Sequence, residues 1–235
     1  MLNVTQKKLR ARIIEVSHMW HSSHLGSCLT AIDALWVLYS IKKPDEPFVL
    51  SNGHAGVAQY VVLESLGILP TAVLEKLFVH PDRCNKYGIN VSTGSLGQGL
   101  PIAIGMALAD KNKQVYCMIS DGECSEGSIW ESFRIIRERK MTNLTIILNA
   151  NGWGAYQEIE LTKLYAQIAG FGLKTVHVNG HDLSNLTQEI QKKRKEPTII
   201  ISRTKNEQLP FLKGQDAHYY VMTDSDYLLA KKIYS

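Results

Sequence analysis

The stretch "MISDGECSEGSIW", residues 118–130, carries the pattern that decides the fold. An apolar run over 115–119 is typical of a buried strand, and it stops at the Asp121-Gly122 pair. A second glycine and a tryptophan then open a segment with the composition of a helix start. A buried strand that passes through a short turn into a helix is the repeating unit of a parallel α/β sheet.

The same unit recurs toward the C-terminus, whereas helical periodicity dominates the first third of the chain. Short apolar runs predict buried strands over 114–120, 144–150, 174–180 and 198–204. Apolar residues at helical spacing predict helices over 6–22, 28–42, 56–67, 127–141 and 184–194. One more helix is expected after the strand over 144–150 and the polar segment that follows it. The pattern therefore predicts one α/β domain over residues 1–235, in which helices cover both faces of a parallel sheet in three layers.

The composition is that of an ordinary globular protein, with 45% hydrophobic and 20% charged residues and a formal net charge of +4. A charge this small gives no reason to expect nucleic-acid binding, and the densest basic run, residues 191–197, is typical of a solvated helix end. No apolar stretch approaches the roughly 18 residues of a membrane span, and the polar, basic start does not resemble a secretory signal. We therefore expect a cytoplasmic protein without nucleic-acid or membrane partners.

Polar residues follow two successive predicted strands at the point where each ends. Asp121 comes directly after the strand over 114–120, and Asn151 directly after the strand over 144–150. Because ligands of parallel sheets bind outside the carboxyl ends of the strands, adjacent strands would bring both side chains to one edge. A carboxylate and an amide oxygen suit Mg²⁺, which completes its shell with phosphate oxygens and water. The spacing alone leaves open a second interpretation, in which both residues only form turns with the glycines that follow them.

Four segments, taken together, resemble the transketolase family from about residue 8 to the C-terminus. The run "DGECSEGSIW…LNANGW" resembles the thiamine diphosphate motif, a GDG sequence followed about thirty residues later by Asn. The other three resemble the family's histidine loop, glycine-rich loop and opening histidine segment; they are "FVLSNGHA" (48–55), "VSTGSLGQGL" (91–100) and "SSHLGSCLTAIDALWVLY" (22–39). By this resemblance the chain is the N-terminal, diphosphate-binding subunit of a split transketolase.

The resemblance places the diphosphate end of thiamine diphosphate at the turn after the predicted strand over 114–120. It implies that Asp121, Asn151 and the main-chain carbonyl of Trp153 bind Mg²⁺, with Asn151 also at the cofactor. Gly122 would let the backbone approach the diphosphate closely. Glu126 corresponds to a family glutamate at the interface between two cofactor sites, although alone it would also suit the first turn of a helix.

Histidines supply the remaining functional groups that the resemblance implies. His54 would lie beside the diphosphate and the reacting centre, and His24 would flank the substrate and donate hydrogen bonds or move protons. His80 matches a histidine that faces the hydroxyls of the donor sugar, and His218 one near the diphosphate. His54, His24 and His80 could each alternatively be a histidine with only a structural role. The loop beside the cofactor ring would contain Gly94, Leu96 and Gln98.

The chemistry implied by the resemblance is ketol transfer. Thiamine diphosphate supplies a carbanion, and the enzyme moves a two-carbon unit from a ketose or its phosphate to an aldose. The half of the family that binds the aminopyrimidine and carries the activating glutamate has no counterpart in these 235 residues. We therefore expect the partner to be a C-terminal transketolase subunit, the assembly to be an α2β2 heterotetramer, and the chain alone to be inactive.

Several positions depart from the family pattern. Ser120 replaces the first glycine of GDG, Ser23 and Leu25 replace the Gly and Pro of the opening histidine segment, and the bulky Trp153 lies beside the expected metal. These departures favour a specialised sugar substrate. Two other functions stay open: a different thiamine diphosphate enzyme that forms an acyloin or decarboxylates a keto acid, and a non-catalytic role in assembly.

Overall fold

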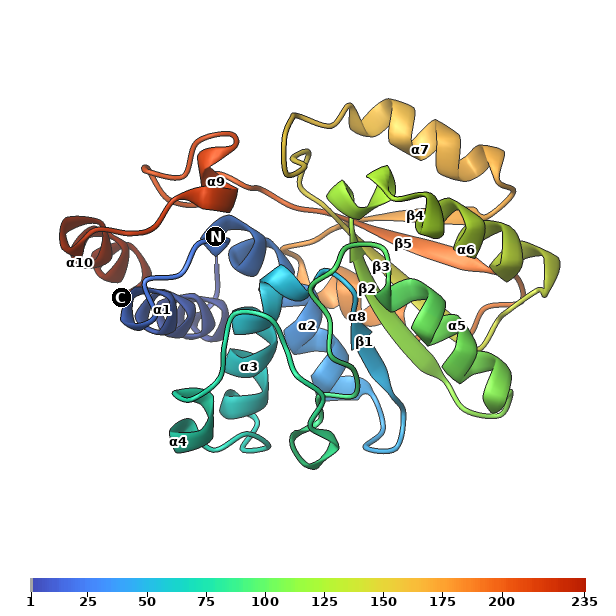
Figure 1. Cartoon of the computed structure of the whole chain (residues 1–235), viewed down its shortest axis with the longest axis horizontal. Coiled ribbons are helices and arrows are strands. Elements are labelled where there is room, and N and C mark those ends of the chain that lie inside the picture. The colour runs from blue at the N-terminus through green and yellow to red at the C-terminus, as the bar shows by residue number, and fades with distance from the viewer. Residues whose placement is uncertain (1) are drawn as a thin grey trace.

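The computed structural model describes residues 2–235, which form a five-stranded sheet of order β1-β2-β3-β5-β4 with helices on both faces (Figure 1). Every neighbouring pair of strands is parallel. The strands are β1 (Phe48–Leu50), β2 (Val115–Ser120), β3 (Leu144–Ala150), β4 (Lys174–Asn179) and β5 (Thr198–Arg203). The prediction of a three-layer α/β fold around a parallel sheet is confirmed.

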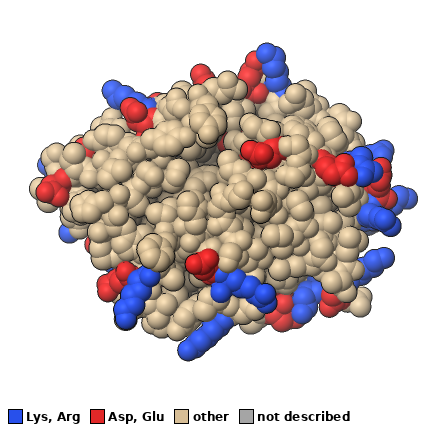
Figure 2. All heavy atoms as spheres, viewed as in Figure 1, with Lys and Arg blue, Asp and Glu red and all other residues tan. Residues whose placement is uncertain are grey.

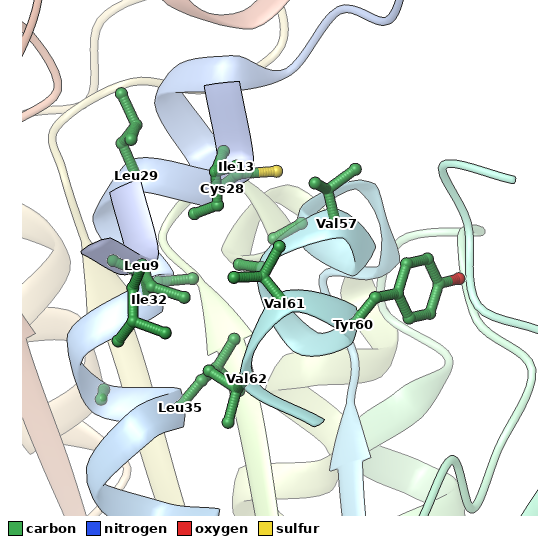
Figure 3. Packing of buried hydrophobic residues seen from close by; sticks show 14 of the residues in the cluster. Leu9, Ile13, Cys28, Leu29, Ile32, Leu35, Val57, Tyr60, Val61 and Val62 are labelled. Carbon is green, nitrogen blue, oxygen red and sulfur yellow. The ribbon is translucent and has the colours of Figure 1, made fainter. Parts of the chain in front are cut away.

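One face of the sheet is covered by the N-terminal helices together with α8, and α10 packs on the outer side of this layer against α1. Their apolar side chains form one cluster with the strand residues Met118, Ile147 and Ile200. Figure 3 shows its centre, where Leu9 and Ile13 of α1 lie beside Ile32 and Cys28 of α2 and face Val61 of α3. The helices are α1 (Val4–Met19), α2 (Leu25–Ile41), α3 (Gly56–Ser65), the short α4 (Thr71–Leu74), α8 (Leu183–Gln191) and α10 (Asp224–Tyr234).

The opposite face of the sheet packs against three helices: α5 (Gly99–Ala109), α6 (Gly127–Glu138) and α7 (Leu161–Gly170). Strand residues in this second cluster include Cys117, Ile146 and Ile199, each one position from a residue that faces the first cluster. Successive side chains of a strand point to opposite faces, so continuous apolar strands are buried on both sides. The near-continuous apolar runs of the sequence are therefore a direct consequence of the three layers.

Most predicted elements lie within a few residues of the observed ones, and local capping explains the differences. The prediction 6–22 for α1 starts too late, because the Asn3 side chain caps the helix and pairs reciprocally with Gln6. It also ends too late, because His21 adopts a left-handed backbone (φ 48°). Strand β1 was not predicted, since it has only three residues, nor was α5, which is apolar on all sides and lacks helical periodicity.

A buried ion pair joins α1 to α2, the helix that begins directly after His24. Both side chains are fully buried, and the Arg10 guanidinium donates to both carboxylate oxygens of Asp33, at 2.9 and 2.6 Å. His181, after β4, contacts the same carboxylate at 2.8 Å. This pairing fixes the middle of α2 against α1 and against the loop after β4. No helix within the described residues is long and apolar enough to span a membrane.

Candidate functional site

Asp121 lies at the carboxyl end of β2, where its buried carboxylate accepts three backbone N–H groups. Oδ1 accepts the N–H of Gly122 at 3.0 Å. Oδ2 accepts those of Asn151 and Gly152, at 2.8 and 2.6 Å, across the end of the neighbouring strand β3. The structure thus confirms that Asp121 and Asn151 meet at one edge of the sheet. Asp121 is more than a turn residue, because its side chain ties two strand ends together.

The backbone beyond Asn151 folds back over Gly122. Asn151 Oδ1 accepts the N–H of Trp153 at 2.9 Å, which directs this loop back toward the Asp121 turn. A Cβ atom on Gly122 would lie 3.3 Å from the Cα of Gly154 and 3.7 Å from the carbonyl oxygen of Trp153. Gly122 therefore leaves room for a close approach at the position that the sequence assigns to the diphosphate.

The charge of Asp121 is only partly compensated by these contacts. Burial raises the pKa of its carboxyl group to about 7, although the N–H groups of Gly152, Gly122 and Asn151 act to lower it. A divalent cation would supply the missing positive charge. Among residues 2–235 no three His, Cys, Asp or Glu side chains gather closely enough to hold a metal. A metal at this turn would therefore rely on amide and main-chain oxygens beside one carboxylate, a donor set that suits Mg²⁺.

Glu123 links two loops of the site to the end of β2, a role that the sequence did not reveal. Its side chain is fully buried. Oε1 accepts the hydroxyl of Ser51 at 2.7 Å and the N–H of Gly97 at 2.8 Å, and Oε2 accepts the N–H of Ser120 at 3.1 Å. Burial raises the pKa of this carboxyl group, against the lowering effect of its three donors. Glu123 thereby joins the loops after β1 and before α5 to the end of β2.

Replacing Glu123 with Ala should destabilise the protein by about 2–4 kcal/mol, because three buried donors lose their acceptor. For a chain of this size the thermal midpoint should fall by roughly 5–15 °C, measured by calorimetry. The matched control is Glu131→Ala, which removes an exposed acid paired with Arg134 on the surface and should shift the midpoint by at most about 2 °C. Equal midpoints for both variants would contradict the linking role of Glu123.

Four histidines from distant parts of the chain converge beside the sheet edge. The ring centroid of His24 lies 5.3 Å from that of His54, 6.5 Å from that of His80 and 6.4 Å from that of His218. The backbone N–H of His24 donates to the carbonyl of His218 at 2.7 Å and so fixes the two segments relative to each other. The four predicted histidines thus form one cluster, in which Nδ1 of His24 and Nδ1 of His218 are buried without a hydrogen-bond partner among residues 2–235. Such groups are suited to a polar ligand.

The environment of the cluster lowers the pKa of three of its histidines, His24, His54 and His218. Burial lowers the pKa of His54 to about 3 and that of His24 to about 4, and the neighbouring imidazoles of the cluster act in the same direction. Burial also lowers the pKa of His218. A neutral imidazole can both accept and donate a proton, as general acid–base catalysis requires.

These shifts predict that acid destabilises the ligand-free chain. The pKa values of His24 and His54 are lower in the folded chain than the ordinary value of 6.5, so the unfolded chain binds more protons below that pH. Their contribution to stability is complete above about pH 6.5 and is lost as the pH falls toward 4. Thermal midpoints between pH 7 and 4.5 should fall more steeply for the wild type than for a His24→Gln/His54→Gln variant. Parallel curves would show that the cluster does not titrate in this way.

The glycine-rich loop lies between the histidine cluster and the end of β2. Gly94, with φ 152°, faces the ring of His80, since a Cβ there would lie 2.8 Å from its Cδ2 atom. A Cβ on Gly97 would lie 2.7 Å from the Cβ of Glu126, so the loop packs directly on that glutamate. Leu96 is partly buried and Gln98 is exposed. The positions of these two residues fit a cofactor loop, while their predicted contacts to the cofactor stay predictions.

Trp153 and Tyr219 add features that the sequence did not predict. The Trp153 indole packs against Gly214, where a Cβ would lie 3.0 Å from the ring. The ring centroid of Tyr219 lies 6.2 Å from that of His24, and its hydroxyl donates to the carbonyl of Ala155 at 2.8 Å. Both contacts arise between segments far apart in the chain, so no local pattern signals them.

Comparison with known proteins agrees with this geometry. Residues 4–208 match the family profile described as "Transketolase, thiamine diphosphate binding domain". The chain is 34% identical over 229 residues to a transketolase from Pongo abelii, with 86% of this chain and 37% of that protein covered. It thus spans less than two fifths of the length of that relative. It is also 30% identical over 256 residues to one subunit of an apulose-4-phosphate transketolase from Phocaeicola vulgatus, with 96% of this chain and 91% of that protein covered.

Solved structures show the same architecture. A transketolase mutant from Pichia stipitis superposes with a TM-score of 0.85 at 21% identity, over 99% of this chain and 41% of that one. A transketolase from Leishmania mexicana superposes with a TM-score of 0.82 at 19% identity, over 100% of this chain and 41% of that one. Together with the match over residues 4–208, these similarities show that the chain belongs to the transketolase family and contains its thiamine diphosphate binding domain.

Proposed function

We propose that this chain is the N-terminal subunit of a split transketolase, which moves a two-carbon ketol unit from a ketose or its phosphate to an aldose. The observation that carries the proposal is the junction at the ends of β2 and β3. There Asp121 binds the backbone of Asn151 and Gly152, while Gly122 leaves space beside the Trp153 carbonyl. This combination of one carboxylate, one amide and a glycine-lined turn suits a magnesium diphosphate.

In this proposal Asp121, Asn151 and the carbonyl of Trp153 hold Mg²⁺, and the backbone at Gly122 receives the diphosphate. When bound, thiamine diphosphate supplies the carbanion needed to break the C–C bond of the ketose. His54 and His24 remain neutral at pH 7, which lets them donate hydrogen bonds to sugar oxygens or exchange protons with them. His80 and His218 complete this polar wall, and His80 is the exposed member, suited to a donor sugar hydroxyl.

We further propose that the partner is a C-terminal transketolase subunit, and that the two chains form an α2β2 heterotetramer. The apulose-4-phosphate relative, which is itself named as one subunit of its enzyme, matches this chain over 91% of its own length. That match supports a division of the enzyme between two chains. Helix α5 contains no charged residue, yet Ile102 and Leu108 are 38% and 42% exposed. Figure 2 shows that Lys, Arg, Asp and Glu gather mainly around the rim of the face that carries α5. A face with few charges suits contact with another protein chain.

Product analysis of the reconstituted complex tests the reaction. The chain and its C-terminal partner are incubated with thiamine diphosphate, Mg²⁺, a ketose phosphate donor and an aldose. The expected products are a ketose two carbons longer than the acceptor aldose and an aldose two carbons shorter than the donor ketose. In a parallel incubation with a keto acid in place of the ketose phosphate, formation of an acyloin or of carbon dioxide would indicate a different thiamine diphosphate enzyme. A complex that binds no cofactor would indicate a role in assembly only. The single domain over residues 1–235, the cytoplasmic location and the lack of nucleic-acid or membrane partners stay predictions.

A further inference from the structure

The loop that carries two of the proposed metal ligands is closed on itself but projects into solvent. The N–H of Ile159 donates to the carbonyl of Gly152 at 2.8 Å, and the N–H of Gly154 to that of Gln157 at 2.9 Å. The tip is open, since Tyr156 is 88% exposed. An exposed loop with two internal backbone bonds opens readily unless something outside it holds it.

Two side chains from the C-terminal segment hold this loop at a single atom. Gln215 Nε2 and Tyr219 Oη both donate to the carbonyl oxygen of Ala155, each at 2.8 Å. These two donors fill both lone pairs of that carbonyl. We call the pair of bonds the Ala155 clamp. Gln215 and Tyr219 lie 60 and 64 positions after Ala155 in the chain, so the clamp fixes the loop against a separate part of the fold.

The segment that provides the clamp is itself anchored. The carbonyl of Gly214 accepts a hydrogen bond from the side-chain amide of Asn206 at 2.9 Å, and the N–H of Gly214 donates to the Glu207 carboxylate at 3.1 Å. Ala217 packs against the first turn of α2, where a Cβ on Gly26 would lie 2.6 Å from that of Ala217. The clamp therefore rests on a support that reaches the helix start next to His24.

We propose that Gln215 and Tyr219 are positioning residues, which hold the Trp153 carbonyl and the Asn151 side chain beside Asp121 before a metal arrives. Ala155 lies two residues beyond Trp153, so fixing its carbonyl restricts the peptide units that present the ligand oxygens. Holding the ligands in place reduces the ordering cost that metal binding would otherwise include. This inference rests on the proposed function and adds residues that no family motif in the sequence marks.

The test removes both donors without changing side-chain size, in the variant Gln215→Met/Tyr219→Phe. The matched control is Tyr220→Phe, because the Tyr220 hydroxyl donates to Asp226 at 2.6 Å and does not touch the loop. Mn²⁺ binding is measured by electron paramagnetic resonance on the complex with thiamine diphosphate and the C-terminal partner. Amide hydrogen exchange over residues 152–159 is measured on the full chain without ligands.

We expect the double variant to bind Mn²⁺ about tenfold more weakly, as the loss of two hydrogen bonds of ordinary strength implies. Exchange over 152–159 should accelerate by at least about tenfold. Tyr220→Phe should change neither quantity. Wild-type exchange and Mn²⁺ affinity in the double variant would overturn the clamp. A wild-type complex that binds no Mn²⁺ would instead overturn the proposed function, and the exchange data distinguish these two failures.

Discussion

Replacing Asp121 with Asn should weaken Mg²⁺-dependent binding of thiamine diphosphate to the reconstituted complex by at least about a hundredfold. The change removes the charged member of the proposed ligand set, and even residues that only orient metal ligands contribute 10–100-fold to affinity. The amide oxygen of the variant can still accept the N–H groups of Asn151 and Gly152, so the fold should persist. Calorimetric titration of the cofactor in Mg²⁺ measures the affinity, and the thermal midpoint checks the fold.

Asp182 offers a matched control for this experiment. It also follows a strand, and its carboxylate accepts the N–H groups of Ser184 and Asn185 at the start of α8. Asn serves as well as Asp at such a helix start. Asp182→Asn should therefore leave cofactor binding unchanged. If Asp121→Asn bound the cofactor as tightly as this control, the metal assignment of Asp121 would be wrong.

Replacing His54 with Ala should lower kcat of the reconstituted complex by about 10²–10⁴-fold, the usual contribution of a positioned acid–base group. The pKa of His54 is lowered to about 3, further than that of His24. Its imidazole is therefore neutral at the near-neutral pH of the assay. Steady-state kinetics with a ketose phosphate donor measure the loss, and Mg²⁺ and cofactor are kept saturating.

His21→Ala is the control, because His21 is exposed at the end of α1. It should retain wild-type kcat. A His54→Ala complex with kcat within about threefold of the wild type would show that His54 has a structural role only.

The part of the site at Asp121 was predictable from the sequence for a physical reason. Strands β2 and β3 are neighbours both along the chain and in the sheet, so the residues after Ser120 and Ala150 necessarily meet. The order β3-β5-β4 could not be predicted, because the hydrophobic pattern of a strand buried on both faces does not specify its neighbours. Here β5 inserts between two strands that precede it in the chain.

The remainder of the site depends on contacts between distant segments. The cluster of His24, His54, His80 and His218 follows from the family resemblance and not from any spacing, since its members come from four separate segments of the chain. Glu123 resembles an ordinary acid in a polar turn, and its burial follows only from the loops that pack on it. No sequence pattern predicts the role of Gln215 and Tyr219 either, because their acceptor at Ala155 lies about sixty residues earlier.

The measurement that tests the central claim most directly is cofactor binding by the two chains separately and mixed. Thiamine diphosphate is titrated into this chain, into the C-terminal partner and into their equimolar mixture, first in Mg²⁺ and then after removal of the metal by chelator. Tight binding by the mixture in Mg²⁺, with little or none in the other samples, is the result that we predict. Equally tight binding by this chain alone, or binding that persists without metal, would contradict a magnesium-dependent site shared between two chains.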